Sequence, residues 1–130
     1  LDRRVRVAAP IVPFLGDFPD YFRLVPWPAS LVFEGAEKQH LTREAVFNLL
    51  SYFDLKNLCR RIECPVLMGF GLQDVITPPH TNFAAYNPIR APKRWICYPE
   101  SGHHAAYDNM DIWIAESTHF FRTHMKTSNR

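Results

Sequence analysis

Two side chains suited to acid–base chemistry each follow an apolar run. Asp74 comes shortly after the uninterrupted run 66–70, and His103 comes shortly after the weaker run 95–98. An apolar run without alternation is typical of a strand buried on both faces of a parallel sheet. The carboxyl ends of parallel strands meet at one edge of a sheet, so we expect Asp74 and His103 to lie within hydrogen-bonding reach, about 2.6–3.2 Å. A carboxylate at that distance fixes the tautomer of an imidazole and stabilises the imidazolium that forms in general-base catalysis.

The chain has no motif for the nucleophile that such a pair would serve. In α/β-hydrolases the order is Ser, then Asp or Glu, then His, and the Ser lies on a G-x-S-x-G turn. The five glycines, of which no two are four positions apart, are Gly16, Gly35, Gly69, Gly71 and Gly102. The same spacing excludes a P-loop and a G-x-G-x-x-G loop. Ser101 and Ser51 are alternative nucleophiles, but Ser101 is only two residues from His103, where attack geometry is hard to reach.

The elements that must hold the pair form a strand–helix–strand unit. A crossover helix is predicted to begin at Pro78-Pro79, with an apolar stripe through Phe83, Ala84 and Tyr86. Such a unit is expected to be right-handed. Residues 3–12 are interpreted as a further strand, and the family resemblance given below implies that it lies beside 66–70. The fold class is therefore α/β, with about three parallel strands and flanking helices.

The remaining segments are predicted to be helices and one loop. Residues 16–30, rich in proline and aromatic residues, are interpreted as a loop with no more than a turn of helix; it could form a pocket wall or an oligomer contact. Thr42 and Asp54 are each predicted to cap a helix. The final helix is expected to run from about Asp108, as its cap, to Lys126.

Composition excludes several classes of function. The 130 residues are 47% hydrophobic and 14% aromatic, and the formal net charge is +2. This length suits one domain or less, and so small a charge gives no reason to expect a nucleic-acid partner. No run reaches the ~18 apolar residues of a membrane span, and no signal peptide pattern opens the chain. We expect a cytoplasmic protein without a membrane partner.

A metal site is a weak alternative use of the histidines. His103 and His104 are adjacent, and Asp108 and Asp111 follow. Zinc requires three or four converging ligands with a preferred spacing, and no H-x-x-x-H or cysteine partner supports one here. The cysteines, which contain no C-x-x-C, are interpreted as free thiols in a reducing compartment. Neither a metal nor another cofactor is predicted.

Several blocks in order resemble the acetyl xylan esterase/cephalosporin C deacetylase family. The blocks, which cover nearly the whole chain, are Leu1–Val5, Val12–Leu15, Ser51–Asp54, Asn57-Leu58, Ile62–Leu67, Gly71–Asp74, Pro78-Pro79, Phe83–Asn87 and Tyr98–His103. The resemblance implies the C-terminal half of an α/β-hydrolase fold. It also implies that Asp74 and His103 are the triad acid and base. Phe14 and Ile76 match apolar residues that wall a small acyl pocket.

The matched region begins after the nucleophile turn of the family. Residues 1–130 are therefore interpreted as a partial domain that lacks the N-terminal half, including the oxyanion-hole donors. The resemblance implies part of a serine carboxylesterase that removes acetyl groups from sugar or cephalosporin-type esters. The missing half would come from another chain or fragment, or from a longer esterase, or self-association would cover the open strand edge. Family members form hexamers, so a homo-oligomer is also consistent.

The alternative function belongs to a different class. A non-catalytic interaction or regulatory domain could keep the hydrolase fold and lack the nucleophile turn. The presence or absence of a G-x-S-x-G motif just before Leu1 would separate the two hypotheses.

Overall fold

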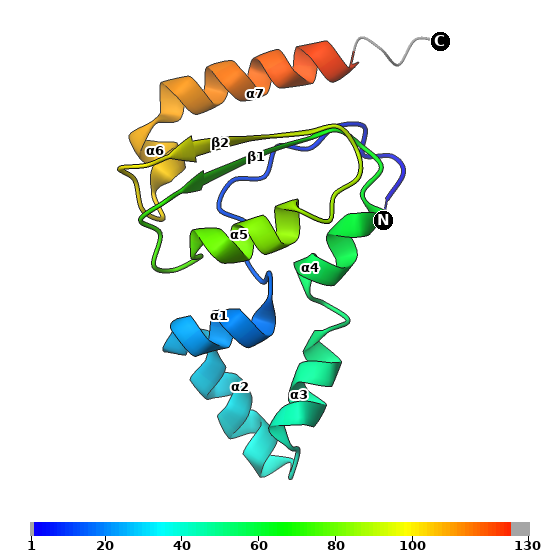
Figure 1. Cartoon of the computed structure of the whole chain (residues 1–130), viewed down its shortest axis with the longest axis vertical. Coiled ribbons are helices and arrows are strands. Elements are labelled where there is room, and N and C mark those ends of the chain that lie inside the picture. Colours follow the sequence, from blue (N-terminus) through cyan, green and yellow to red (C-terminus); the bar gives the residue numbers. More distant parts are fainter. Residues whose placement is uncertain (1, 126–130) are drawn as a thin grey trace.

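The structure is a computed structural model that describes residues 2–125. Strands β1 (Val66–Gly71) and β2 (Lys93–Tyr98) form a parallel pair between helices α5 (Pro79–Tyr86) and α7 (Met110–Met125) (Figure 1). The other elements are α1 (Phe18–Leu24), α2 (Pro26–Lys38), α3 (Arg43–Leu50), α4 (Leu55–Leu58), the 3-10 helix η1 (Cys59–Arg61) and α6 (Ala105–Asp108). Helices α1, α2 and α3 form a group on the far side of α5 from the sheet (Figure 1).

Strand β1 is the centre of the core. All of its residues are buried, as its uninterrupted apolar run predicts. The Phe70 ring packs 4.7 Å from that of Phe83 on α5, while the Trp113 ring of α7 lies directly over Gly69. Successive residues of a strand point to opposite faces, so β1 packs against one helix on each side. The predicted strand–helix–strand unit is confirmed, with register from Val66↔Lys93 to Gly71↔Tyr98.

The prediction of a continuous strand over residues 3–12 is wrong in detail. The segment runs beside β1 but pairs with it only through two isolated parallel bridges, Ala8↔Val66 and Ile11↔Gly69. The carbonyl of Pro10 accepts from the Gly69 amide at 3.0 Å, but proline has no N–H to return a bond to β1. The ladder is therefore interrupted, and the sheet consists of two strands and one bridged segment among the described residues.

The loop prediction for residues 16–30 is also wrong. This stretch contains all of α1 and the beginning of α2. Its prolines lie in the first turns of helices, where the missing N–H would have no partner within the helix, with Pro19 in α1 and Pro26 in α2. Trp27 keeps an extended backbone inside α2, which interrupts that helix near its start. Proline here marks helix starts rather than preventing helices.

Asp54 caps one helix, as predicted, and also holds a second. Its Oδ1 accepts from the amides of Lys56 and Asp17, each at 2.8 Å, and its Oδ2 accepts from the Phe18 amide at 2.9 Å. Asp54 thus ties the start of α1 to the start of α4, and it is buried. The Thr42 cap is likewise confirmed, since its hydroxyl accepts from the Ala45 amide at 3.1 Å.

The predicted cap of the last helix is wrong. Asp108 is the last residue of α6, and α7 begins after Asn109. The Asn109 side chain donates to Ser101 Oγ and to the Ala105 carbonyl, each at 3.0 Å, so it fixes the junction between the two helices. Lys126, the predicted end of the helix, lies outside the described residues.

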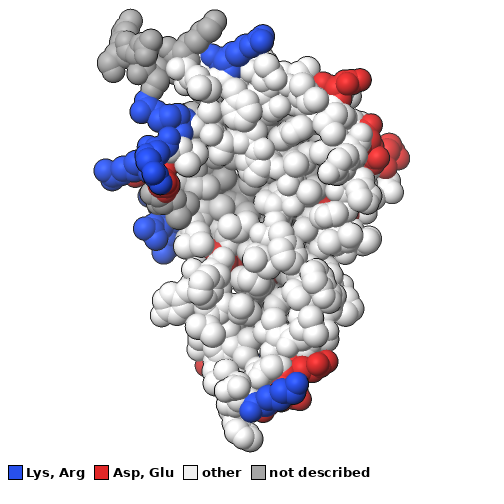
Figure 2. All heavy atoms as spheres, turned by 180° about the vertical axis from the view of Figure 1, so that it is seen from behind, with Lys and Arg blue, Asp and Glu red and all other residues white. Residues whose placement is uncertain are grey.

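Basic side chains gather along one side of the molecule (Figure 2). A hollow of about 650 Å³ lies near the amino ends of β1 and β2, and its lining includes Arg3, Arg60, Arg61, Glu63 and Arg90. Asp74 and His103 follow the opposite, carboxyl ends of these strands.

None of the helices within residues 2–125 has both the length and the apolar character that crossing a membrane requires.

The Asp54 network predicts a measurable loss of stability. Asp54→Ala removes three hydrogen bonds to a buried carboxylate, so we expect the free energy of unfolding to fall by about 2–4 kcal/mol. Thr42→Ala removes one bond at an exposed cap and should cost only about 1 kcal/mol. Urea denaturation followed by circular dichroism measures both changes. Equal losses of unfolding free energy in the two variants would contradict the proposal that Asp54 links the start of α1 to the start of α4.

Candidate active site

The loops after the two strands are joined by backbone hydrogen bonds. The Leu72 amide donates to the Tyr98 carbonyl at 3.1 Å, and the Gln73 amide donates to the Ser101 carbonyl at 3.0 Å. These bonds continue the β1–β2 pairing beyond the end of the sheet. As a result, the turn that carries Asp74 and the turn that carries His103 lie side by side.

Gly71 permits this close approach. A Cβ atom at Gly71 would collide with the carbonyl oxygens of Ser101 and Gly102. Both are backbone atoms, so neither can move aside without displacing the loop that leads to His103. The glycine is therefore required by steric crowding at the point where the loops cross.

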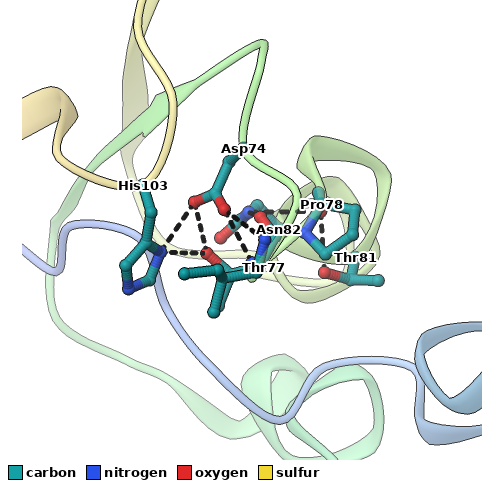
Figure 3. A network of polar contacts seen from close by, with 7 residues as sticks. Asp74, Thr77, Pro78, Thr81, Asn82 and His103 are labelled. Carbon is teal, nitrogen blue, oxygen red and sulfur yellow. Dashed lines mark hydrogen bonds and ion pairs between the residues drawn. The ribbon is translucent and has the colours of Figure 1, made fainter. Parts of the chain in front are cut away.

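Asp74 and His103 form a hydrogen-bonded pair. His103 Nδ1 lies 2.9 Å from Asp74 Oδ2, within the predicted range (Figure 3). The Asp74 side chain is completely buried, whereas the His103 side chain is 31% exposed. The Nε2 atom of His103 points away from Asp74 (Figure 3). One nitrogen thus contacts the carboxylate, while the other faces away from it.

The Asp74 carboxylate is saturated with hydrogen bonds. Oδ1 accepts from the amides of Ile76 and Thr77, each at 2.8 Å. Oδ2 accepts from the Thr77 hydroxyl at 2.6 Å and faces His103 Nδ1. Burial by itself would raise the pKa of Asp74, but the bonds from Thr77, His103 and Ile76 outweigh it and lower the pKa below its ordinary value. The group is therefore held as a charged carboxylate.

Of the two predicted pocket residues, Ile76 lies in the Asp74 turn and Phe14 packs against the helices that follow it in the chain. Ile76 is part of that turn, and it is 42% exposed. Phe14 packs edge-on against Tyr21 at 5.4 Å between ring centroids and stacks on Trp27 at 6.5 Å. Burial raises the pKa of Tyr21, and the charge of Asp74 raises it further. Asp20 of α1 lies 3.8 Å from His80 of α5. Ile76 therefore lies at the candidate site, whereas the contacts of Phe14 are with aromatic side chains of α1 and α2.

The alternative nucleophiles are engaged elsewhere. Ser101 is buried, and its Oγ accepts from Asn109 at 3.0 Å. Ser51 donates its hydroxyl to the Asn48 carbonyl at the end of α3. Within residues 2–125, the recorded side-chain contacts of His103 are those with Asp74, Thr77 and His104. A nucleophile for His103 is thus not found among the described serines.

The metal alternative gains no support from the geometry. Among the described residues, no cluster of three or more His, Cys, Asp or Glu side chains could hold a metal ion. His104 instead packs its ring against Tyr107, with 6.1 Å between ring centroids.

The sequence predicted that Asp74 and His103 meet, which the structure confirms, but it did not identify the contacts that Thr77 and Asn82 make at this turn. Thr77 follows Asp74 by three residues, a spacing at which a turn lets an aspartate side chain accept from the backbone ahead of it. That signal was available in the sequence. The packing of Phe14 against Tyr21 was not, because it depends on helix α1 forming in a stretch that was predicted to be a loop.

The sequence and the structure of this chain are both similar to those of known esterases. The family described as Acetyl xylan esterase (AXE1) matches residues 1–123. An acetyl esterase, Axe7A, from Xylanibacter ruminicola is 34% identical over 105 residues, which are 79% of this chain and 23% of that protein. The acetyl xylan esterase from Paenibacillus sp. R4 superimposes with a TM-score of 0.71 and 34% identity, over 88% of this chain and 39% of that one.

Solved structures of low sequence identity share the fold of this chain. The alpha/beta hydrolase domain-containing protein 10 from mouse matches with a TM-score of 0.61 at 12% identity, over 93% of this chain and 54% of that one. At that identity the likeness concerns the fold alone, and it supports a partial α/β-hydrolase. The chain spans well under half the length of its two esterase relatives. On the match over residues 1–123, the chain belongs to the acetyl xylan esterase family.

Proposed function

We propose that this chain supplies the base and the acid of a serine esterase that removes acetyl groups from carbohydrate or cephalosporin-type esters. The chain belongs to an esterase family, and the finer assignment rests on the 2.9 Å contact between Asp74 Oδ2 and His103 Nδ1. The serine would come from the preceding half of the fold, on the same or another polypeptide. The names of the relatives, an acetyl esterase and an acetyl xylan esterase, support acetylated carbohydrate as the substrate class.

The reaction proceeds by acyl transfer. The serine Oγ attacks the acetyl carbonyl while His103 Nε2 takes the serine proton, and the resulting imidazolium is stabilised by Asp74. The C–O bond to the sugar then breaks, and Nε2 returns the proton to the leaving alkoxide. Water attacks the acetyl-serine with Nε2 again as the base, which releases acetate and restores the serine. Phe14 and Ile76 would line the space for the small acyl group.

The catalytic assignment predicts large losses of activity in a complete enzyme. The chain, joined or mixed with a polypeptide that supplies the nucleophile half, should hydrolyse 4-nitrophenyl acetate and release acetate from acetylated xylo-oligosaccharides. His103→Ala and Asp74→Asn should each lower kcat by about 10³-fold or more. His119→Ala, on the exposed surface of α7, is the control and should change kcat less than about twofold.

Two outcomes would contradict this assignment. One is a His103→Ala enzyme with the activity of the unchanged chain. The other is a serine-directed phosphonate that labels a serine of this chain. A correctly assembled complex with an intact His103 and no turnover would instead favour the non-catalytic interaction domain.

The charged state of Asp74 can be tested on the chain alone. Its pKa is lowered in the fold, so ionisation stabilises the folded state above the unfolded pKa of about 3.9, and this stabilisation disappears as pH falls through the folded pKa. Urea unfolding of the unchanged chain and of Asp74→Asn should therefore differ most near neutral pH. The difference should shrink as the pH falls below about 4. A difference that does not vary with pH would contradict an ionised Asp74.

A further inference from the structure

Thr77 contacts both members of the proposed dyad through one buried hydroxyl group. Its Oγ1 lies 2.6 Å from Asp74 Oδ2 and 3.3 Å from His103 Nδ1 (Figure 3). The residue is only 1% exposed, so water does not compete for these contacts. The arrangement is a triangle of carboxylate, hydroxyl and imidazole.

The hydrogen atoms in this triangle can be assigned by counting. A threonine hydroxyl has one hydrogen to donate, and an ionised carboxylate has none. The 2.6 Å distance is typical of an O–H···O⁻ bond, so the Thr77 hydrogen is directed to Asp74. What Thr77 Oγ1 offers to His103 is then a lone pair. Nδ1 of His103 consequently faces two acceptors, Asp74 Oδ2 and Thr77 Oγ1.

We propose that Thr77 is a positioning residue that holds neutral His103 in its Nδ1–H tautomer by donating to Asp74 and accepting from His103. The inference rests on the proposed function, because this tautomer leaves the Nε2 lone pair available to a serine hydroxyl. Thr77 acts through His103 and touches no reacting atom in this scheme. Thr77 is therefore a third residue that contributes to the arrangement of Asp74 and His103.

The position of the Thr77 hydroxyl is itself fixed by two neighbouring elements. The Thr77 amide donates to Asp74 Oδ1 at 2.8 Å, and the Thr77 carbonyl accepts from Asn82 Nδ2 of α5 at 2.8 Å. Asn82 is completely buried. Helix α5 therefore anchors the backbone of the turn that carries Thr77 (Figure 3).

Other titratable groups near the pair do not replace Thr77. His104, which follows His103, has its ring centroid 6.1 Å from that of His103. The pKa of Tyr21 on α1 is raised, first by burial and then by the negative charge of Asp74. Within the described part of the chain, the hydrogen-bond contacts recorded for His103 Nδ1 are those with Asp74 and Thr77.

Nitrogen NMR of the histidine rings tests the proposal without any ester substrate. In the ¹⁵N-histidine-labelled chain, at a pH where His103 is neutral, Nδ1 should show the chemical shift of a protonated ring nitrogen and Nε2 that of an unprotonated one. In Thr77→Val the population of the Nε2–H tautomer should rise severalfold. Thr77→Ser keeps the hydroxyl and should restore the spectrum of the unchanged chain.

Thr81→Val is the matched control. Thr81 is a buried threonine at the start of α5, and its hydroxyl donates to the Pro78 carbonyl at 2.7 Å instead of to the dyad. It should leave the His103 tautomer unchanged. A Thr77→Val chain that keeps its backbone spectrum and the same Nδ1–H signal would overturn the proposal.

The test remains decisive if Thr77→Val does not fold. An unchanged chain whose neutral His103 is found mainly as the Nε2–H tautomer would overturn the inference by itself. Failure of the proposed function would look different. A complete enzyme that lacks esterase activity, while its His103 keeps the Nδ1–H tautomer through Thr77, would contradict the function and leave the positioning role intact.

Discussion

The buried charge of Asp74 is the constraint on which this end of the molecule depends. A carboxylate removed from water is costly unless hydrogen bonds replace its hydration. Here the donors come from two places, the turn 76–77 and the loop that carries His103. The carboxylate is fully satisfied only when both segments are in place. Satisfying one buried charge therefore brings together the two loops that contain the proposed acid and base.

The sheet and its glycines make that meeting possible. The β1–β2 register ends with Gly71 opposite Tyr98, so the two chains leave the sheet at the same level. The absence of a side chain at Gly71 then lets the backbone of residues 101–102 cross directly over the end of β1. Helix α5 holds the other side through Asn82 and Thr77. The geometry of the pair is thus determined by elements contained within the chain.

The sequence predicted best those features that local patterns determine. The apolar run 66–70 indicated a buried strand, Thr42 and Asp54 were recognisable as caps, and the order of strands brought Asp74 beside His103. The errors arose where a residue has two permitted roles. Proline both breaks and begins helices, so residues 16–30 were misread, and Pro10 lies in a paired segment whose ladder it interrupts. The packing of Phe14 against Tyr21 and Trp27 depended on helices formed by that misread stretch, which no local pattern predicted.

The residues that orient His103 all lie within this chain, which bears on how a complete esterase would be assembled. Asp74, Thr77 and His103 are positioned by β1, β2, α5 and their loops, and the hydrogen bonds that link the two turns to each other and to α5 join residues within 72–103. All of these bonds form without a contribution from the preceding half of the fold. Its proposed task is to bring a serine and the oxyanion donors to the Nε2 side of His103, which faces away from Asp74. Because Asp74 and His103 are already paired in this chain, the free energy of assembly need not be used to bring them together.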